Sequence, residues 1–380
     1  MRRLVSPVVV ALVAATTVVT AVVTAGTASA DTRPVAGAGY VWANSPTTAS
    51  YTPHLTYQMN SISTTTRNTI TRRGTGYYAV TFTGLGVSGG VAHATAYGDN
   101  THQCKPDTWV ASGIDQTVVI RCYTLAGAPV DSQFTASFTN KRVWPGFEYG
   151  QTYPGGYVHL TNSSSATSTP PYHQQFNSAG MTNTVSRTGV GTYKVFMPEI
   201  GRTTRAGHAR VTSVGWGATR CKVFSFGWGT PASTIQVNIR CFNAAGTPTD
   251  SGFSMTFTDR TNTFGLHGCC NPDGHQSAYA LANNATAASY TPSLSYQHEV
   301  PSGVATATRS GTGNYAMHFA NADLATGHVH VAATNSWNAE FCKVVSWNSS
   351  IGINVRCYSA TGAPVDTSYQ IDHTGPYLLG

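Results

Sequence analysis

The chain has little charge. Asp, Glu, Lys and Arg make up 10% of its 380 residues, with 22 basic side chains against 15 acidic ones. Binding to the phosphate backbone of a nucleic acid relies on clustered Lys and Arg, so this mild excess argues against a nucleic-acid partner. The surface must instead be covered by Thr, Ser, Asn, Gly and Tyr. Such a surface is typical of extracellular β-proteins.

Several signals of other protein classes are missing. No segment shows a sustained helical period of apolar residues with a capping residue. There is no phosphate-binding loop and no dinucleotide fingerprint. Residues 86–90 match Gly-x-Ser-x-Gly, but a nucleophile elbow joins a strand to a helix, whereas this segment is expected to join two strands. The aligned repeats hold Arg205 or Thr326 there, so the motif does not indicate a hydrolase.

Only one long apolar run is present, at the N-terminus. Residues 8–23 are rich in Val, Ala and Leu, two arginines precede them, and Ala-Ser-Ala follows at 28–30. This order predicts a secretory signal peptide over residues 1–30. A membrane anchor is the less favoured interpretation, because threonines interrupt the run and no basic flank follows it. Removal of Arg2 and Arg3 leaves 20 basic and 15 acidic side chains, a net charge of +5, and no predicted membrane span.

The chain does contain a repeat of about a hundred residues. Segments 39–139, 156–258 and 277–374 align with one another. Each contains Arg-x-Gly-x-Gly-x-Tyr, a Gly-rich turn before a strand, and Arg-Cys-aromatic followed by a Gly-x-Pro turn and an Asp. Short β-branched runs alternate with turn residues throughout.

We therefore predict an all-β fold of three tandem β-sandwich modules, immunoglobulin-like or jelly-roll-like, with a small barrel as the alternative. The modules are expected to fold separately, like beads on short linkers. Their predicted bounds are 31–139, 156–258 and 277–380, with linkers at 140–155 and 259–276.

Eight cysteines follow the predicted export signal, and an oxidising compartment favours their pairing. Six occupy equivalent places in the repeats, which predicts one disulfide in each module: Cys104 with Cys122, Cys221 with Cys241, and Cys342 with Cys357. Cys269 and Cys270 lie in the second linker beside His and Asp residues. A disulfide of some kind is favoured for them over a metal site, because adjacent cysteines rarely chelate one ion.

Residues present in every module are expected to serve the module itself. The repeated aspartates are predicted to bond their own turn backbone. The two sets of repeated arginines are likewise predicted to have a structural role within their own module. The residues concerned are Asp131, Asp250 and Asp366; Arg72, Arg187 and Arg309; and Arg121, Arg240 and Arg356.

Candidate functional residues are those in which the copies differ. In the third module His328 and His330 lie on one face of a predicted strand, and His318 turns outward from the preceding hairpin. Three histidines and water form a catalytic zinc pattern. A zinc site is therefore one hypothesis, and scattered surface histidines are the simpler alternative.

Two further sets predict ligand contacts. Trp216 and Trp337 lie in polar loops five residues before the first module cysteine, where the first module has Asp99. Exposed rings on a surface of low charge suit stacking on sugars or apolar polymers. The second module also carries a basic run that could meet an anionic glycan, or could be a solvated face. Its members are Arg202, Arg205, His208, Arg210, Arg220 and Lys222.

The order of a Gly-Thr-Gly-x-Tyr element, a Cys-Lys-Val strand, Arg-Cys-Tyr/Phe and Gly-x-Pro-x-Asp resembles that of secreted tandem β-repeat proteins of high-GC Gram-positive bacteria. The resemblance covers nearly all of the chain after the signal, and it implies export and repeated architecture without a particular activity.

Two functions remain as hypotheses. The favoured one is a secreted binding or adhesive protein for a carbohydrate or cell-envelope polymer, in which three modules provide avidity. The alternative is a secreted polysaccharide-active hydrolase or lyase, with its site in one divergent module or an inter-module cleft and with metal assistance. One deep polar pocket of non-repeated residues would favour the enzyme, and equivalent shallow faces would favour the binding protein.

Overall fold

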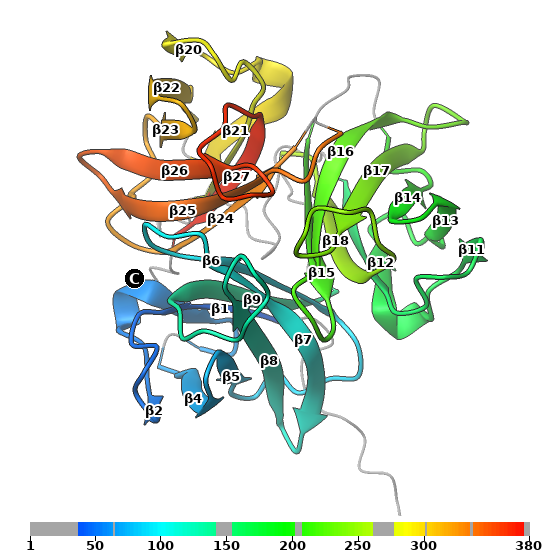
Figure 1. Cartoon of the computed structure of the whole chain (residues 1–380). Helices are drawn as coiled ribbons and strands as arrows, with labels where there is room; N and C mark the ends of the chain where they lie inside the picture. Colours follow the sequence, from blue (N-terminus) through cyan, green and yellow to red (C-terminus); the bar gives the residue numbers. More distant parts are fainter. Residues whose placement is uncertain are drawn as a thin grey trace, which may run out of the picture. The chain divides into compact units, whose positions relative to one another are not determined.

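The computed structural model describes residues 37–63, 65–141, 154–201, 207–260, 277–300, 302–334 and 337–375. Within these ranges the regular elements are β-strands and three short 3-10 helices. None of the helices in this part of the chain has the length and hydropathy needed to cross a bilayer. The strands form three successive sets, coloured blue to teal, green, and yellow to red in Figure 1. We call these sets modules 1, 2 and 3.

Module 1 contains β1 (Gly37–Ala43), β2 (Ser50–Tyr51), η1 (Leu55–Tyr57), β3 (Gln58–Asn60), β4 (Thr69–Gly74), β5 (Tyr77–Phe82), β6 (Val91–Ala96), β7 (Gln103–Ser112), β8 (Asp115–Tyr123) and β9 (Phe134–Asn140). Module 2 contains β10 (Gly155–Leu160), β11 (Thr167–Ser168), η2 (Tyr172–Gln174), β12 (Gln175–Asn177), β13 (Thr184–Gly189), β14 (Thr192–Met197), β15 (His208–Val214), β16 (Arg220–Trp228), β17 (Ile235–Phe242) and β18 (Gly252–Thr258). Module 3 contains β19 (Ser277–Ala282), β20 (Ser289–Tyr290), η3 (Leu294–Tyr296), β21 (Gln297–Val300), β22 (Thr306–Gly311), β23 (Asn314–His318), β24 (His328–Ala333), β25 (Phe341–Asn348), β26 (Gly352–Tyr358) and β27 (Tyr369–Thr374).

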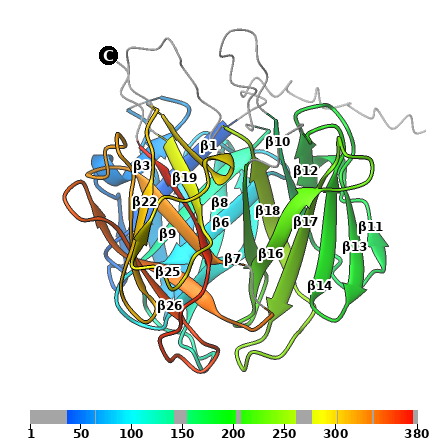
Figure 2. The same ribbon diagram turned by 90° about the horizontal axis from the view of Figure 1, so that it is seen from above.

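Each module is a sandwich of two antiparallel sheets with the same strand order. In module 1 the four-stranded sheet runs β3-β1-β9-β6 and the five-stranded sheet runs β2-β4-β5-β8-β7. Modules 2 and 3 repeat both orders strand for strand, and Figure 2 shows the five-stranded sheet of module 2 from β11 to β16. The all-β fold of three β-sandwich modules is therefore confirmed.

The core of each module lies between its two sheets. Alternate residues of each strand point inward, because side chains of a strand alternate between the faces of its sheet. A tyrosine of the five-stranded sheet packs on an aromatic ring of the four-stranded sheet in every module. The pairs are Tyr78 and Phe134 (ring centroids 5.1 Å apart), Tyr193 and Phe253 (5.3 Å), and Tyr315 and Tyr369 (5.2 Å).

The three predicted module disulfides are confirmed. Cys104–Cys122, Cys221–Cys241 and Cys342–Cys357 each join the last two strands of a five-stranded sheet at directly paired positions. Cys269 and Cys270, and the predicted signal peptide at residues 1–30, lie outside the described residues.

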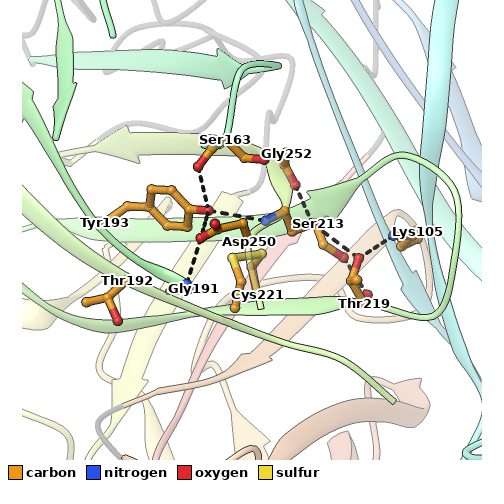
Figure 3. Close-up of a disulfide and its surroundings, with 12 residues drawn as sticks. Lys105, Ser163, Gly191, Thr192, Tyr193, Ser213, Thr219, Cys221, Asp250 and Gly252 are labelled. Carbon is orange, nitrogen blue, oxygen red and sulfur yellow. Dashed lines mark hydrogen bonds between the residues drawn. A yellow bond between two sulfur atoms is a disulfide. The ribbon is translucent and has the colours of Figure 1, made fainter. Parts of the chain in front are cut away.

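Beside each disulfide, the repeated aspartate holds a hairpin of the five-stranded sheet. In module 2 Asp250 Oδ1 accepts hydrogen bonds from Arg187 Nε (2.9 Å), the Gly191 amide (2.9 Å) and the Tyr193 hydroxyl (3.1 Å). Figure 3 shows Asp250 with Gly191 and Tyr193 next to Cys221. The prediction that the aspartate bonds its own turn was wrong. Its oxygens accept from a hairpin that lies 57 to 63 residues earlier in the chain, and the sandwich brings this hairpin next to the turn.

The second glycine of Arg-x-Gly-x-Gly-x-Tyr is required by this arrangement. Gly191 has a φ of +64°, and a Cβ at this position would lie 2.4 Å from the carbonyl oxygen of Cys241. Gly76 and Gly313 meet the same backbone atom of Cys122 and Cys357 at 2.5 Å. Only glycine combines a positive φ with so close an approach, so this motif is a structural signature of the module.

The modules are joined by buried contacts, and the expectation of separate beads was wrong. The described parts of all three modules belong to one compact unit, residues 34–380. Buried hydrogen bonds connect them, for example from Thr95 Oγ1 of module 1 to the Val331 carbonyl of module 3 (3.1 Å) and from Thr334 Oγ1 of module 3 to the Val223 carbonyl of module 2 (2.7 Å).

We predict that Tyr193→Phe lowers the free energy of unfolding by about 1–3 kcal/mol, because the Ser251 amide and the Ser163 carbonyl lose their partner, the Tyr193 hydroxyl. Urea unfolding at pH 7 measures the change. Tyr172→Phe, at a side chain that is 76% exposed, is the matched control and should change stability by less than about 0.5 kcal/mol. Equal effects of the two substitutions would contradict a structural role for the cluster.

Candidate functional site

One set of contacts repeats around a closed ring of modules, from module 1 to 2, from 2 to 3 and from 3 back to 1. The glycine before β6, β15 or β24 donates its amide to the 3-10 helix region of the next module. The three bonds are Gly90 to His173 O (2.9 Å), Gly207 to Ser295 O (3.3 Å) and Gly327 to Thr56 O (2.9 Å). Each module therefore uses the same two surfaces, one toward each neighbour, as in a cyclic trimer.

Strand β6 lies beside both β15 and β24 where the modules meet (Figure 1). Polar side chains of these three strands contact the neighbouring modules. His93, Arg210 and His330 occupy equivalent positions, and each bonds a residue on the last strand of the next module. The three contacts are His93 Nε2 with Thr256 Oγ1 (2.8 Å), Arg210 Nη1 with Asp372 Oδ1 (2.9 Å), and His330 Nε2 with Ser137 Oγ (3.4 Å). We call these residues the axial cluster.

Burial keeps the axial histidines neutral. It lowers the pKa of His93 and His330 well below the ordinary value, and the nearby Arg210 charge acts in the same direction. His328, whose ring centroid is 4.4 Å from that of His330, has its pKa lowered by burial to about 3. For Asp372, burial acts to raise the pKa, but the Arg210 charge and the His208 hydrogen bond outweigh it and lower the pKa.

Beyond the axial cluster, a partly enclosed cavity of about 90 Å³ lies between the modules. A lysine from each module lines it, in each case the residue after the first module cysteine. Each lysine bonds the loop of the next module: Lys105 Nζ to Thr219 Oγ1 (2.6 Å), Lys222 Nζ to Glu340 Oε2 (2.9 Å), and Lys343 Nζ to Asn100 Oδ1 (2.5 Å). Figure 3 shows the contact of Lys105 with Thr219.

The loops that follow β6, β15 and β24 carry the aromatic candidates. Trp216 and Trp337 are 73% and 67% exposed, as their polar loops predicted. An arginine of the preceding module lies over each ring, Arg121 at 3.8 Å from the Trp216 ring centroid and Arg240 at 3.4 Å from that of Trp337. We call each ring with its arginine a platform.

In module 1 the position equivalent to Trp216 and Trp337 is Asp99, which forms an ion pair with Arg356 of module 3. The expectation that Arg121, Arg240 and Arg356 serve their own module was therefore incomplete, because each also reaches the next module. The ring has two aromatic platforms and one ion pair at equivalent positions.

The predicted three-histidine zinc site is not assembled. His318 lies on β23 in the five-stranded sheet, whereas His328 and His330 lie on β24 in the four-stranded sheet. Residues 317, 329 and 331 point into the core, so the histidines next to them in the chain turn outward, as predicted. His318 therefore points out of the sandwich from the five-stranded sheet, whereas His328 and His330 point out from the four-stranded sheet on the opposite side. The part of the chain that the structure describes holds no group of three His, Cys, Asp or Glu residues suited to a metal ion.

The basic run predicted in module 2 is not an exposed face, because its described members are buried. Arg202 and Arg205 lie outside the described residues. Arg210 is 4% exposed and paired with Asp372, so it is an interface residue and not a surface ligand contact. Sequence reasoning missed Lys105 and Lys343, although a lysine after the first cysteine of every module was a visible signal.

Comparisons of the chain with protein-family models, with curated proteins and with solved structures found no match.

We predict that the free energy of unfolding falls as the pH is lowered from 7 toward 4. In the unfolded chain histidine titrates near 6.5, whereas in the folded protein the pKa values of His93, His328 and His330 lie lower, so the unfolded state binds more protons below pH 6.5. Each such histidine contributes up to about 1.4 kcal/mol per pH unit. Urea unfolding of the parent and of His330→Gln across this range measures the slope, and an equal slope in both would refute the assignment for His330.

We further predict that Lys222→Met lowers the free energy of unfolding by about 3–5 kcal/mol, because it leaves the Glu340 carboxylate buried without its cation. The double variant Lys222→Met/Glu340→Leu should recover most of this loss. A double-mutant cycle in urea provides the coupling free energy between modules 2 and 3. Additive effects would mean that the pair does not couple the modules.

Proposed function

We propose that the protein is an extracellular binding protein that recognises a carbohydrate or cell-envelope polymer through its two platforms. The observation that carries the proposal is the pair of exposed tryptophan rings, Trp216 and Trp337, each backed by an arginine of the neighbouring module. An arginine over the ring restrains it, and most of each tryptophan stays exposed to solvent. A fixed, exposed aromatic face suits stacking on the apolar face of a sugar ring.

The ring of modules supports binding at two points. Equivalent contacts hold both platforms, so their spacing is set by the packing of the modules and not by flexible linkers. Two sites at a fixed distance favour a repeating polymer over a single small sugar, since the second contact becomes intramolecular. Three internal disulfides and the predicted signal peptide agree with export.

The alternative of a hydrolase or lyase has weaker support. Two of the buried carboxylates between the modules, Asp372 and Glu340, are held by Arg210 and Lys222. Carboxylates fixed in this way resemble structural ion pairs more than a free general acid and base.

We predict that Trp216→Ala and Trp337→Ala each weaken binding to the recognised polymer at least about tenfold, as expected when a central aromatic contact is truncated. Depletion assays on chitin, cellulose and purified peptidoglycan sacculi measure the dissociation constants. Tyr172→Ala is the matched control. Tyr172 is exposed, but it lies on η2 next to His173, which contacts Gly90 before the start of β6. The platforms instead lie in loops that follow the ends of the equivalent strands β15 and β24.

A gain-of-function variant sharpens this test. Asp99→Trp places a ring beside Arg356, at the position equivalent to Trp216 and Trp337. Affinity for the same polymer should rise as a third platform forms. Binding that is indifferent to all three substitutions, or an absence of binding to any of the polymers, would overturn the proposal.

A further inference from the structure

The cavity between the modules holds more cationic than anionic side chains. Lys105, Lys222, Lys343, Arg210 and Arg220 line it, whereas Glu340 is the carboxylate among its lining residues. Glu340 bonds Lys222, and Arg210 bonds Asp372. Lys105, Lys343 and Arg220 take part in neither of these two ion pairs.

Lys105 and Lys343 donate to neutral groups, the Thr219 hydroxyl and the Asn100 amide oxygen. Burial lowers the pKa of both to about 7, and Asp107 and Asp99 oppose this only in part. The buried charge is therefore poorly compensated, and a nearby anion would stabilise the ammonium form of both lysines.

Arg220 is the most informative lining residue. It is 8% exposed, and its Nε donates to the Ala339 carbonyl at 3.2 Å. Its Nη1 and Nη2 atoms are buried and have no hydrogen-bond partner among the residues that the structure describes. Burial lowers its pKa to about 10. A buried guanidinium with two unsatisfied nitrogens is costly, and its planar fork fits two oxygens of one oxyanion.

We propose that this cavity binds one small oxyanion, phosphate or sulfate, with the Arg220 guanidinium as its principal ligand and Lys105 and Lys343 supplying further positive charge. A volume of about 90 Å³ exceeds the roughly 10–15 Å³ that a single water requires, so a small ion fits with its remaining hydration. Modules 1 and 3 hold Gln103 and Phe341 at the position of Arg220. The site therefore exists once per chain and not three times.

Isothermal titration of the whole protein with inorganic phosphate, and separately with inorganic sulfate, at constant ionic strength tests the proposal. We expect a stoichiometry of one. Arg220→Gln, which introduces the module 1 residue, should weaken binding at least tenfold. Arg73→Gln, at an exposed arginine on β4, is the matched control and should bind like the parent.

Thermal unfolding separates loss of the site from loss of the fold. Without added anion, Arg220→Gln should melt at or above the temperature of the parent, because an unsatisfied buried cation is removed. Phosphate should raise the melting temperature of the parent, by linkage, and not that of the variant. Should Arg220→Gln not fold, Lys105→Met/Lys343→Met provides the same comparison with Arg220 retained, and its affinity should also fall at least tenfold.

Competition identifies the source of the anion. Dextran sulfate that displaces inorganic sulfate in an Arg220-dependent way would indicate an anionic group on a polymer, and failure to compete would indicate a free ion; both agree with the site. No binding by the parent at millimolar phosphate and sulfate, or equal binding by Arg220→Gln, overturns it. These experiments do not involve the platforms, so they test the anion site independently of the proposed polymer binding.

Discussion

The contact from β6, β15 or β24 to the last strand of the next module is the constraint on which the rest of the structure depends. It is made by His93, Arg210 and His330 at one equivalent position, and it closes the ring only because each module presents the same donor surface and the same acceptor surface. These axial contacts are polar, so their geometry must satisfy buried donors and acceptors, while aromatic contacts such as Trp42 with Trp347 also join neighbouring modules. That requirement fixes the modules against one another and turns three sandwiches into one unit.

The copies differ at several positions where the modules meet. The loops after β6, β15 and β24 place Asp99, Trp216 and Trp337 at equivalent points, and the strand starts behind them place Gln103, Arg220 and Phe341. A cyclic trimer of identical chains would repeat each of these three times. A single chain with three copies can keep the contacts that close the ring and vary other residues at equivalent positions. Such variation gives two platforms and one arginine in the cavity, which are the positions that we propose as binding sites.

The sandwich fold, the module disulfides and the exposure of Trp216 and Trp337 were all predictable. They depend on local signals: alternation along strands, turn residues at regular spacing, and cysteines at equivalent places. The metal hypothesis was wrong for a tertiary reason. Alternation correctly turned His318, His328 and His330 away from the core, but it cannot tell which of the two sheets a strand joins, and outward residues of opposite sheets face away from each other.

By itself, the sequence determined the class and the repeat of this protein, because period, turn chemistry and cysteine spacing are properties of short segments. Only the tertiary structure decided that Asp250 holds a hairpin through Arg187 and Tyr193, that Arg121 and Arg240 lie over rings of the next module, and that Lys105, Lys343 and Arg220 share one cavity. Each of these contacts joins residues that are distant in the chain. Such partners are selected by the packing of sheets and modules, where burial requires polar groups to be satisfied, and no local pattern encodes that choice.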